Sequence, residues 1–235
     1  MRKIRLTGFR SVLRPFLGTI VKVNTDLPLV ALTFDDGPHP IYTPALLEIL
    51  AKHNVKATFF LIGRAAALHP ELVHQIQSAG HVLGNHSWSH PSFVDIPARQ
   101  RKEQIRRWEQ TVGLQTNKLF RPPYGHQNIN SRLQMWWLGY QVVTWNIAIH
   151  DWLPISVDEV KERLCQQIRP GAIILLHDSS HRVFSEALDM DCSTLLFGLD
   201  QVLELLHSSY RFVTVPDLMS YGRSTQVIWN MEREV

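Results

Sequence analysis

The sequence predicts an α/β domain built on a mostly parallel sheet, either open or closed into a barrel. Short β-branched runs alternate along the chain with segments of helical periodicity. Polar motifs directly follow several of these runs. At 235 residues, 45% hydrophobic and 19% charged, the chain is typical of a globular protein and not of a disordered or membrane-spanning one. No repeat or Pro/Gly/Ser-rich linker divides it, so we expect a single domain.

The first half of the chain is predicted to contain three strands, each followed by a helix. Thr43 and Pro44 are expected as the N-cap and first-turn residues of the first helix, and Pro70 and Pro97 open the other two. The third helix runs to about Val112. The predicted strands cover residues 29–34, 57–62 and 80–84.

The second half repeats this alternation. Ser156 followed by Glu159 forms a capping box, which starts a helix that runs to about Ile168. The other predicted helices cover residues 131–138 and 195–206. The predicted strands cover residues 118–120, 141–145, 172–176 and 211–215.

Positive charge is concentrated at the start of the chain. Residues 1–22 hold six basic and no acidic side chains, whereas the rest holds 18 basic and 21 acidic ones. We interpret residues 1–27 as a basic leader in solvent, with weak peripheral contact of residues 1–22 with an anionic membrane as the alternative. Its longest apolar run is too short for a signal peptide, and no segment has the length of a membrane span.

The two cysteines, Cys165 and Cys192, have neither Cys-x-x-Cys spacing nor the number that a disulfide framework requires. Both are expected to be reduced thiols. The expected compartment is therefore the cytoplasm, with peripheral membrane contact as the alternative.

Five polar motifs lie immediately after predicted strands or at their ends. Because the carboxyl ends of parallel strands meet at one edge of a sheet, we expect these motifs to share one face of the domain. In chain order they are TFDDGP at 33–38, HSWSH at 86–90, RPPYG at 121–125, DW at 151–152 and LLHD at 175–178.

These residue types suit metal-assisted hydrolysis. Asp35 and Asp36 are adjacent carboxylates that point to different sides, so that one can bind a metal while the other moves a proton. His86 and His90 are four residues apart, which on one helical turn would place both rings on one face, as a divalent metal requires. Such a ligand set leaves coordination positions open, as in hydrolytic sites. Asp35 and His177 would then supply a base and an acid.

Each motif taken alone also has an ordinary structural interpretation. Asp-Asp-Gly is a common turn, paired histidines often lie on a helix surface, and Arg-Pro-Pro-Tyr-Gly is a rigid turn. His177 and Asp178 could simply precede a helix as its cap region. The five motifs together, each at a strand end, favour the functional interpretation.

The five motifs in this order resemble the polysaccharide deacetylase domain, also called the NodB-homology domain or carbohydrate esterase family 4. The similarity covers roughly residues 28–216. It implies a distorted (β/α) barrel with fewer than eight regular strands. We accordingly assign residues 28–221 to the catalytic domain and residues 222–235 to a C-terminal tail.

The resemblance also implies an activity and its partners. The activity would be removal of N-acetyl groups from N-acetylglucosamine units of an oligo- or polysaccharide, with one divalent ion, usually zinc, and cobalt or another ion tolerated. The expected partner is an acetylated amino-sugar glycan and not a nucleic acid. The oligomeric state, the particular glycan and the acyl group stay open.

By the same resemblance, the first motifs would hold the metal and the base. Asp36, His86 and His90 would be the metal ligands. Asp35 would take a proton from the metal-bound water, and Arg121 would pair with Asp35 to hold it ionised.

The later motifs would complete the site by the same resemblance. The backbone N–H of Tyr124 would help to stabilise the oxyanion. His177 would protonate the leaving amine, and Asp151 would orient His177. Trp152 and Leu175 would line the acetyl pocket.

One feature departs from the family pattern. Many members carry a second acidic residue shortly before the Asp-Trp pair, where this chain has Asn146 and Ala148. The tuning of His177 would then fall to Asp151 alone.

Other residues near the motifs are given non-ligand roles. Four histidines are expected to be exposed or to belong to subsites: His39, His126, His150 and His181. Trp88 is expected near the metal because it lies between two ligands, and Trp136 and Trp137 are expected in the core of a helix face. Residues 179–193 are expected to form a mobile loop beside the site.

Two alternatives remain open. One keeps the metal chemistry but changes the substrate, as in a deformylase or a cyclic-amide hydrolase. The other is an inactive glycan-binding module, which loss of the base or of a ligand would mark. The sequence retains Asp35, all three proposed ligands and His177.

Overall fold

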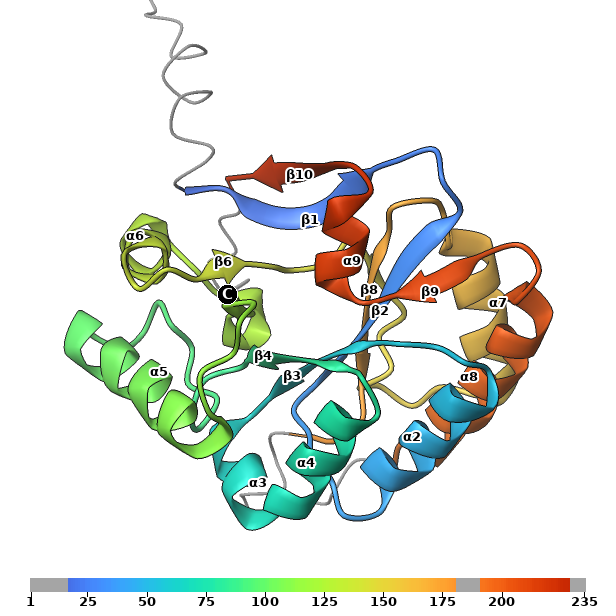
Figure 1. Ribbon diagram of the computed structural model, residues 1–235, viewed down its shortest axis with the longest axis horizontal. Helices are drawn as coiled ribbons and strands as arrows, with labels where there is room; N and C mark the ends of the chain where they lie inside the picture. The colour runs from blue at the N-terminus through green and yellow to red at the C-terminus, as the bar shows by residue number, and fades with distance from the viewer. Residues whose placement is uncertain (1–16, 181–190, 229–235) are drawn as a thin grey trace, which may run out of the picture.

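One curved sheet of parallel strands organises the protein (Figure 1). The computed structural model describes residues 17–180 and 191–228. Within these residues the sheet has eight strands in the order β6-β5-β4-β3-β2-β8-β7, with β9 also paired to β2. The strands are β2 (Leu29–Asp35), β3 (Thr58–Leu61), β4 (Val82–Asn85), β5 (Leu119–Phe120), β6 (Gln141–Val142), β7 (Ile147–Ala148), β8 (Ile173–His177) and β9 (Arg211–Val213).

Strand β2 is the centre of this sheet. One of its edges pairs with β8 along residues 31–35, and the other pairs with β9 over residues 29–31 and with β3 over residues 33–35. All seven residues of β2 are buried. A strand covered on both faces can be apolar almost throughout, which is why the sequence shows a continuous run here instead of an alternation.

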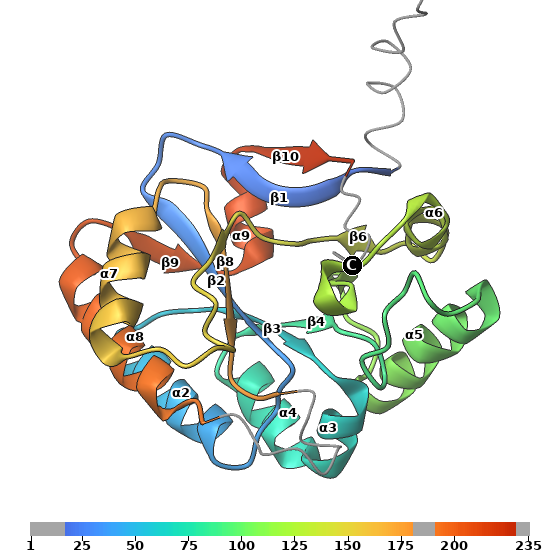
Figure 2. The same ribbon diagram turned by 180° about the vertical axis from the view of Figure 1, so that it is seen from behind.

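Helices surround the outer face of the sheet, as Figures 1 and 2 show. Parallel neighbours need a crossover connection, and here helices make most of these connections. They are α2 (Tyr42–Lys52), α3 (Gly63–Leu68), α4 (Pro70–Ser78), α5 (Ala98–Val112), α6 (Ile129–Trp137), α7 (Val157–Gln167) and α8 (Ser193–Leu206).

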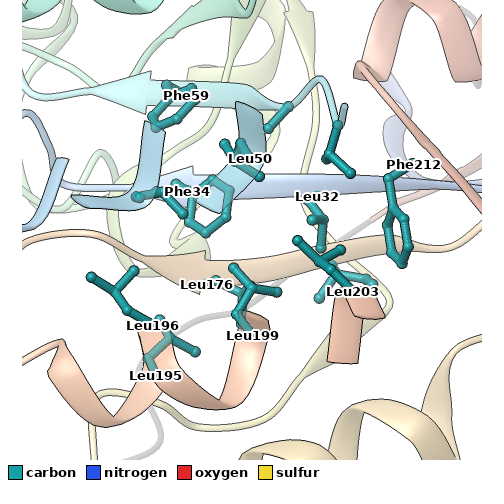
Figure 3. Packing of buried hydrophobic residues seen from close by; sticks show 14 of the residues in the cluster. Leu32, Phe34, Leu50, Phe59, Leu176, Leu195, Leu196, Leu199, Leu203 and Phe212 are labelled. Carbon is teal, nitrogen blue, oxygen red and sulfur yellow. The ribbon is translucent and has the colours of Figure 1, made fainter. Parts of the chain in front are cut away.

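Alternate residues of β2 build two different cores. Leu32 and Phe34 point outward and pack with Leu176 of β8 against Leu199 and Leu203 of α8 (Figure 3). Ala31 points inward and belongs to a second cluster, which fills the barrel interior. By the same alternation Asp35 faces the interior, as does His177 on β8.

The curvature of the sheet follows from its connectivity. Strands β6 and β7 lie at opposite ends of the strand order, yet only residues 143–146 separate them in sequence. The five residue steps from Val142 to Ile147 span at most about 18 Å, so the two ends of the sheet must approach each other. The Thr144 N–H donates to the Ile20 carbonyl (2.8 Å), and the Asn146 side chain accepts from the Ile173 N–H (2.8 Å). The predicted α/β fold, a distorted barrel, is confirmed.

A second, two-stranded sheet covers the end of the barrel at which the parallel strands begin. It pairs β1 (Thr19–Asn24) with β10 (Arg223–Val227) in antiparallel fashion. The inner cluster includes Ile20 and Val23 of β1 together with Val215 of α9 (Val215–Ser220). The folded unit therefore extends on both sides of the predicted range 28–221. The remainder of the leader and tail, residues 1–16 and 229–235, lies outside the described residues.

Most predicted elements are present within a few residues of the expected bounds, including the capping box of Ser156 and Glu159. Three expectations about helix starts and strand ends were wrong. Helix α2 begins at Tyr42 with Ile41 as its N-cap, so Thr43 lies inside the first turn. Strand β9 ends at Val213 because the Thr214 side chain caps α9. Strand β6 is only two residues long, although 141–145 was predicted.

Trp136 and Trp137 also differ from expectation. They were predicted in the core, but they are 45% and 83% exposed. The two cysteines form no disulfide. Among the described residues, no helix is both long and apolar enough to span a membrane.

The barrel closure makes Gly171 sensitive to substitution. Gly171 has φ +77, and a Cβ there would overlap the Val23 carbonyl oxygen of β1; Gly113 has a similar φ of +89 but faces open space. We predict that Gly171→Ala lowers the free energy of unfolding by about 3 kcal/mol or more, because backbone strain and overlap add. Gly113→Ala carries only the backbone strain at φ 89 and ψ 161, of about 1–3 kcal/mol. Urea unfolding of both variants tests this, and equal losses would contradict it.

Candidate active site

The two adjacent aspartates separate because the backbone changes direction between them. Asp35 is the last residue of β2 and keeps the extended conformation, whereas Asp36 has φ 75. An L-residue adopts this left-handed conformation only where the surroundings require it. Asp35 therefore faces the barrel interior, and Asp36 turns toward the loop after β4. Both side chains are buried.

The two histidines lie on a loop and not on the helical turn that the spacing predicted. The Asn85 side chain, at the end of β4, accepts from the Ser87 N–H (2.8 Å), and the Ser87 hydroxyl accepts from the His90 N–H (3.0 Å). Ser87 and His90 both have positive φ, 68 and 58. This hydrogen-bonded loop, and not helical periodicity, brings the two imidazoles to the same side.

Asp36, His86 and His90 form one buried cluster. Oδ1 of Asp36 lies 3.5 Å from Nε2 of His86 and 3.3 Å from Nε2 of His90. The two Nε2 atoms are 3.1 Å apart. In the part of the chain that the structure describes, this is the one group of three His, Cys, Asp or Glu side chains able to share a metal ion.

The chemistry of these donors fits a divalent cation. Nδ1 of His86 lies 2.8 Å from the Arg121 carbonyl oxygen, which can only accept, so Nδ1 carries the proton. Burial lowers the pKa of His86 to about 4 against the attraction of Asp36, so its Nε2 presents a lone pair. That lone pair faces a carboxylate oxygen and a second imidazole nitrogen. Electron-rich atoms this close repel one another unless a proton or a metal cation lies between them, and this donor set suits zinc or cobalt.

Asp35 is held by a fully buried arginine. Nη1 of Arg121 donates to Oδ1 of Asp35 (2.7 Å) and to the Thr33 hydroxyl (2.7 Å). Nη2 donates to the Thr144 carbonyl (2.9 Å), and Nε donates to the Val143 carbonyl (3.3 Å). Burial raises the pKa of Asp35 to about 6, although Arg121 opposes this rise. The carboxylate is thus ionised at neutral pH, yet basic enough to accept a proton.

His177 stands beside Asp35 and pairs with a second buried carboxylate. His177 and Asp35 are register partners on β8 and β2. Nδ1 of His177 lies 3.1 Å from Oδ1 of Asp151, and the His177 N–H donates to Oδ2 of Asp151 (2.7 Å). Burial alone would lower the pKa of His177, but Asp151, with Asp36 and Asp35, raises it to about 9. His177 is therefore a protonated donor at neutral pH.

Two aromatic residues flank this group, each 44% exposed. Tyr124, on the turn η1 (Pro123–Gly125), has φ 58, and its ring centroid lies 4.5 Å from that of His90. Trp152 packs edge-on against His177, with centroids 5.5 Å apart. Leu175 shares the inner face of β8 with His177 and is buried. Every residue predicted for the site thus lies at the carboxyl ends of the strands.

Several neighbouring residues do not belong to this group. His39 was expected to be exposed or to belong to a subsite; it is buried, and its Nδ1 accepts from the backbone N–H groups of Ile41 (3.1 Å) and Tyr42 (3.3 Å) at the start of α2. His126 contacts the Ser92 hydroxyl (3.1 Å), and His181 lies outside the described residues, as does most of the predicted loop 179–193.

Asn146 and Trp88 also contact the scaffold and not the clustered site residues. Asn146 binds the first residue of β8, far along the strand from His177, so an acid at this position would not reach that histidine. Trp88 lies beneath the Arg107 guanidinium, 4.2 Å from its ring centroid, and packs against Gly63. It therefore contacts α3 and α5, although it stands between two of the clustered histidines in sequence.

The sequence interpretation missed a buried contact between the first and last motifs. The Thr43 hydroxyl donates to Oδ2 of Asp178 (2.5 Å) and accepts from the His39 N–H (2.7 Å). A Cβ on Gly37 would lie 2.5 Å from Oδ1 of Asp178, so glycine leaves room for that carboxylate. Asp178 thereby ties the loop that carries Asp36 to the strand that carries His177. The sequence signal for this contact was Asp178, the acidic residue directly after His177. In the sequence alone the two residues resemble the cap region of a helix.

The comparisons with known proteins agree with this geometry. Residues 22–143 match the family model "Polysaccharide deacetylase". The chain is 35% identical over 201 residues to a peptidoglycan-N-acetylglucosamine deacetylase of Bacillus cereus, which covers 83% of this chain and 69% of the relative. It is 36% identical over 166 residues to a chitooligosaccharide deacetylase of Azorhizobium caulinodans, covering 69% of this chain and 79% of the relative.

Solved structures of similar fold include a protein described as a deacetylase and one described as a pseudoenzyme. The Bc1960 peptidoglycan N-acetylglucosamine deacetylase superposes with a TM-score of 0.80 at 30% identity, covering 92% of this chain and 98% of that one. BA3943 of Bacillus anthracis, described as a CE4 family pseudoenzyme, superposes with a TM-score of 0.75 at 26% identity, covering 89% and 72%.

The ion pair of His177 and Asp151 gives a pH-dependent prediction. The pKa of His177 is about 9 in the folded protein against 6.5 in an unfolded chain. A raised pKa stabilises the fold fully below the unfolded value, and that stabilisation is lost as the pH rises through about 9. We predict that Asp151→Asn lowers the pKa of His177. The variant should destabilise the metal-free protein most below about pH 6.5, where the wild-type stabilisation is complete. An NMR titration of His177 that is unchanged in the variant would contradict this.

The Thr43–Asp178 contact gives a second prediction. Thr43→Val keeps the side-chain shape but removes the hydroxyl, and so leaves a buried carboxylate oxygen without its donor. We expect a loss of about 1–3 kcal/mol in the free energy of unfolding. Thr43→Ser is the matched control, because it keeps the hydroxyl and removes only a methyl group. Urea unfolding decides, and a valine variant at least as stable as the serine variant would be inconsistent with the contact.

Proposed function

The chain belongs to the polysaccharide deacetylase family, and we propose that it is a metal-dependent hydrolase that removes N-acetyl groups from N-acetylglucosamine-type units of a glycan. The observation that carries the proposal is the placement of Asp35 and His177 on neighbouring strands beside the buried cluster of Asp36, His86 and His90. A base, an acid and a metal-binding set at one edge of the sheet are the groups that hydrolysis of an amide requires.

Asp36, His86 and His90 would hold the divalent ion. When bound, such an ion acts as a Lewis acid that makes water more acidic and polarises a carbonyl group. Three protein ligands leave positions for water and substrate, as in catalytic and not structural sites. The Arg121 carbonyl fixes the ring of His86 through Nδ1 (2.8 Å), so that its Nε2 keeps facing the cluster.

Asp35 would be the base that accepts the proton of the attacking water. Its partner Arg121 orients one carboxylate oxygen at 2.7 Å and leaves the other, Oδ2, on the side of His86, 3.7 Å from Nε2. A pKa of about 6 places Asp35 among bases that are ionised at neutral pH but not too weak to take a proton.

His177 would donate a proton to the departing nitrogen. An amine is a poor leaving group, so cleavage of an amide needs an acid that is protonated at working pH, and the Asp151 ion pair keeps His177 in that form. The backbone N–H of Tyr124 would help to stabilise the oxyanion, and Leu175 with Trp152 would bound a pocket for the small acyl group.

The exposed rings beside the site support a sugar substrate. Tyr124 and Trp152 flank the cluster from different loops and are both partly exposed. Aromatic faces provide apolar surface on which pyranose rings can stack. The relatives are named a peptidoglycan-N-acetylglucosamine deacetylase and a chitooligosaccharide deacetylase, and these names support an acetylated amino-sugar glycan as the proposed substrate.

A substrate panel tests the proposed function. Free amine and acetate would be measured for the metal-loaded protein with chitooligosaccharides, peptidoglycan fragments and acetylated xylan. We expect equal release of amine and acetate from at least one N-acetylated glycan. Release of acetate from xylan alone would indicate an esterase, and binding of glycan without any release would favour an inactive module.

The metal assignment gives a direct prediction. The purified protein should bind one zinc or cobalt ion per chain, and His90→Ala should abolish this stoichiometric binding because only two ligands remain. His126→Ala is the control, since His126 lies nearby in sequence but contacts Ser92. Metal analysis after dialysis measures both variants. Full retention of the ion by His90→Ala would show that the ion binds elsewhere.

The acid assignment predicts a difference between substrates. His177→Ala should lower the rate on an N-acetylated oligosaccharide by about 10²–10⁴, because the amine must be protonated as it leaves. An aryl acetate has a good leaving group, so its hydrolysis should fall much less. Rates on both substrates would be compared at equal metal content. Equal losses on the two substrates would argue against His177 as the proton donor.

A further inference from the structure

The loop of residues 86–90, which we call the histidine loop, decides whether the two clustered histidines face Asp36. Two of its residues, Ser87 and His90, have φ 68 and 58, a conformation that a non-glycine residue keeps only where its surroundings hold it. The hydrogen bonds described above fix the two ends of the loop. Its middle is held by other elements of the fold.

One glutamine on α5 binds the middle of the histidine loop. Oε1 of Gln104 accepts from the Trp88 N–H (2.9 Å) and from the Ser89 N–H (2.8 Å). Nε2 of Gln104 donates to the Ser89 hydroxyl oxygen (3.0 Å). Two consecutive N–H groups that share one acceptor must both point toward it. The contact therefore fixes the orientation of both peptide groups relative to α5.

Helix α3 holds the opposite side of the histidine loop. The first two N–H groups of α3 donate to the carbonyl oxygens of Ser87 and Trp88, both at 2.9 Å. The Trp88 ring packs against Gly63, where a Cβ would lie 2.6 Å from the ring, and beneath the guanidinium of Arg107. The carbonyl side of the loop is thus tied to α3, and its N–H side is tied to α5 by Gln104.

We propose that Gln104 is a positioning residue of the candidate metal site, which keeps His86 and His90 turned toward Asp36 by binding the backbone between them. This inference rests on the metal site of the proposed function. The hydrogen bonds of Gln104 are to Trp88 and to Ser89, the two residues in the middle of the loop, so it acts on the histidines through the loop backbone.

The contact should affect metal binding more than the stability of the fold. Without the glutamine oxygen, water would hydrogen-bond the two N–H groups, because the contact with Ser89 is exposed. A water molecule is not attached to α5, so the loop would have more conformations open to it. A bound ion would then have to restrict these conformations, which costs part of its binding free energy. Removal of the Gln104 oxygen therefore weakens the metal site.

The zinc affinity of the full chain tests the inference. Gln104→Met keeps an unbranched side chain but removes the oxygen, and we expect it to weaken zinc binding by about 10–100-fold, the range for residues that orient metal ligands. Gln104→Glu should bind zinc like the wild type, because a carboxylate oxygen accepts from the same two N–H groups. Competition with a chromogenic chelator measures both affinities. Gln104→Asn, whose amide is one methylene group shorter, repeats the test if the methionine variant does not fold.

Gln134 on α6 offers a matched control. Like Gln104 it is half-buried, but its side-chain hydrogen bonds hold α5 itself: Oε1 accepts from Nε of Arg101 (2.8 Å), and Nε2 donates to the Ala98 carbonyl (2.7 Å). Gln134→Met should lower the urea concentration at which the protein unfolds, because hydrogen bonds are lost, and should leave the zinc affinity unchanged.

Three outcomes would overturn the inference. One is a zinc affinity of Gln104→Met equal to that of the wild type. A second is an equal loss of affinity in Gln134→Met, which would assign the effect to displacement of α5. A third is an equal loss in Gln104→Glu, which would show that the two N–H groups do not need this acceptor. In all three the wild type still binds one zinc ion, so the proposed function stands. A wild type that binds no zinc would instead contradict the proposed function, and this inference with it.

Discussion

Arg121 reaches Asp35 across the interior of the barrel and at the same time binds the carbonyl groups of Val143 and Thr144. A guanidinium removed from water is tolerated only when its N–H groups find acceptors and its charge finds a partner. The two carbonyls are available because residues 143–146 cross from one end of the sheet to the other. Closure of the barrel thus supplies the acceptors for Arg121, and Arg121 supplies the charge that keeps Asp35 ionised.

The rest of the site is arranged around that pair by strand order. Strand β2, which carries Asp35, pairs on one side with β8, which carries His177. On its other side β3 lies between β2 and β4, and the loop that holds His86 and His90 follows β4. The Arg121 carbonyl also fixes His86, so one residue orients both the proposed base and a proposed ligand. The contact of Asp178 with Thr43 holds the Asp36 loop against β8. Loss of either connection should therefore affect more than one group of the site.

The sequence predicted the fold class because it depends on local patterns, whereas most of the candidate site residues and their roles were implied by the family resemblance. The strands that carry the motifs are continuous apolar runs, and each motif follows its strand directly, so Asp35 and His177 could be placed at strand ends. The histidine loop could not be predicted in this way. Its conformation depends on hydrogen bonds from Asn85 and on positive φ at Ser87 and His90, which periodicity does not register.

Other differences arise from tertiary context. Strands β1 and β10 pair across about two hundred residues of sequence, and neither has a local pattern that identifies its partner. Trp136 and Trp137 look like core residues by composition, yet the packed side of α6 is occupied by Met135 and by the buried Arg132. His39 precedes α2, and its Nδ1 accepts from the N–H groups of Ile41 and Tyr42, whereas the Thr43 hydroxyl accepts from the His39 N–H and does not act as the expected N-cap.

The most direct test of this account is the rate of deacetylation by metal-loaded Asp35→Asn. The substitution keeps the size of the side chain and leaves Asp36, His86 and His90 in place, but an amide cannot accept the proton. The account predicts that the variant binds metal at the wild-type stoichiometry and releases amine from an N-acetylated oligosaccharide about 10²–10⁴ times more slowly. Deacetylation near the wild-type rate, at equal metal content, would contradict the account.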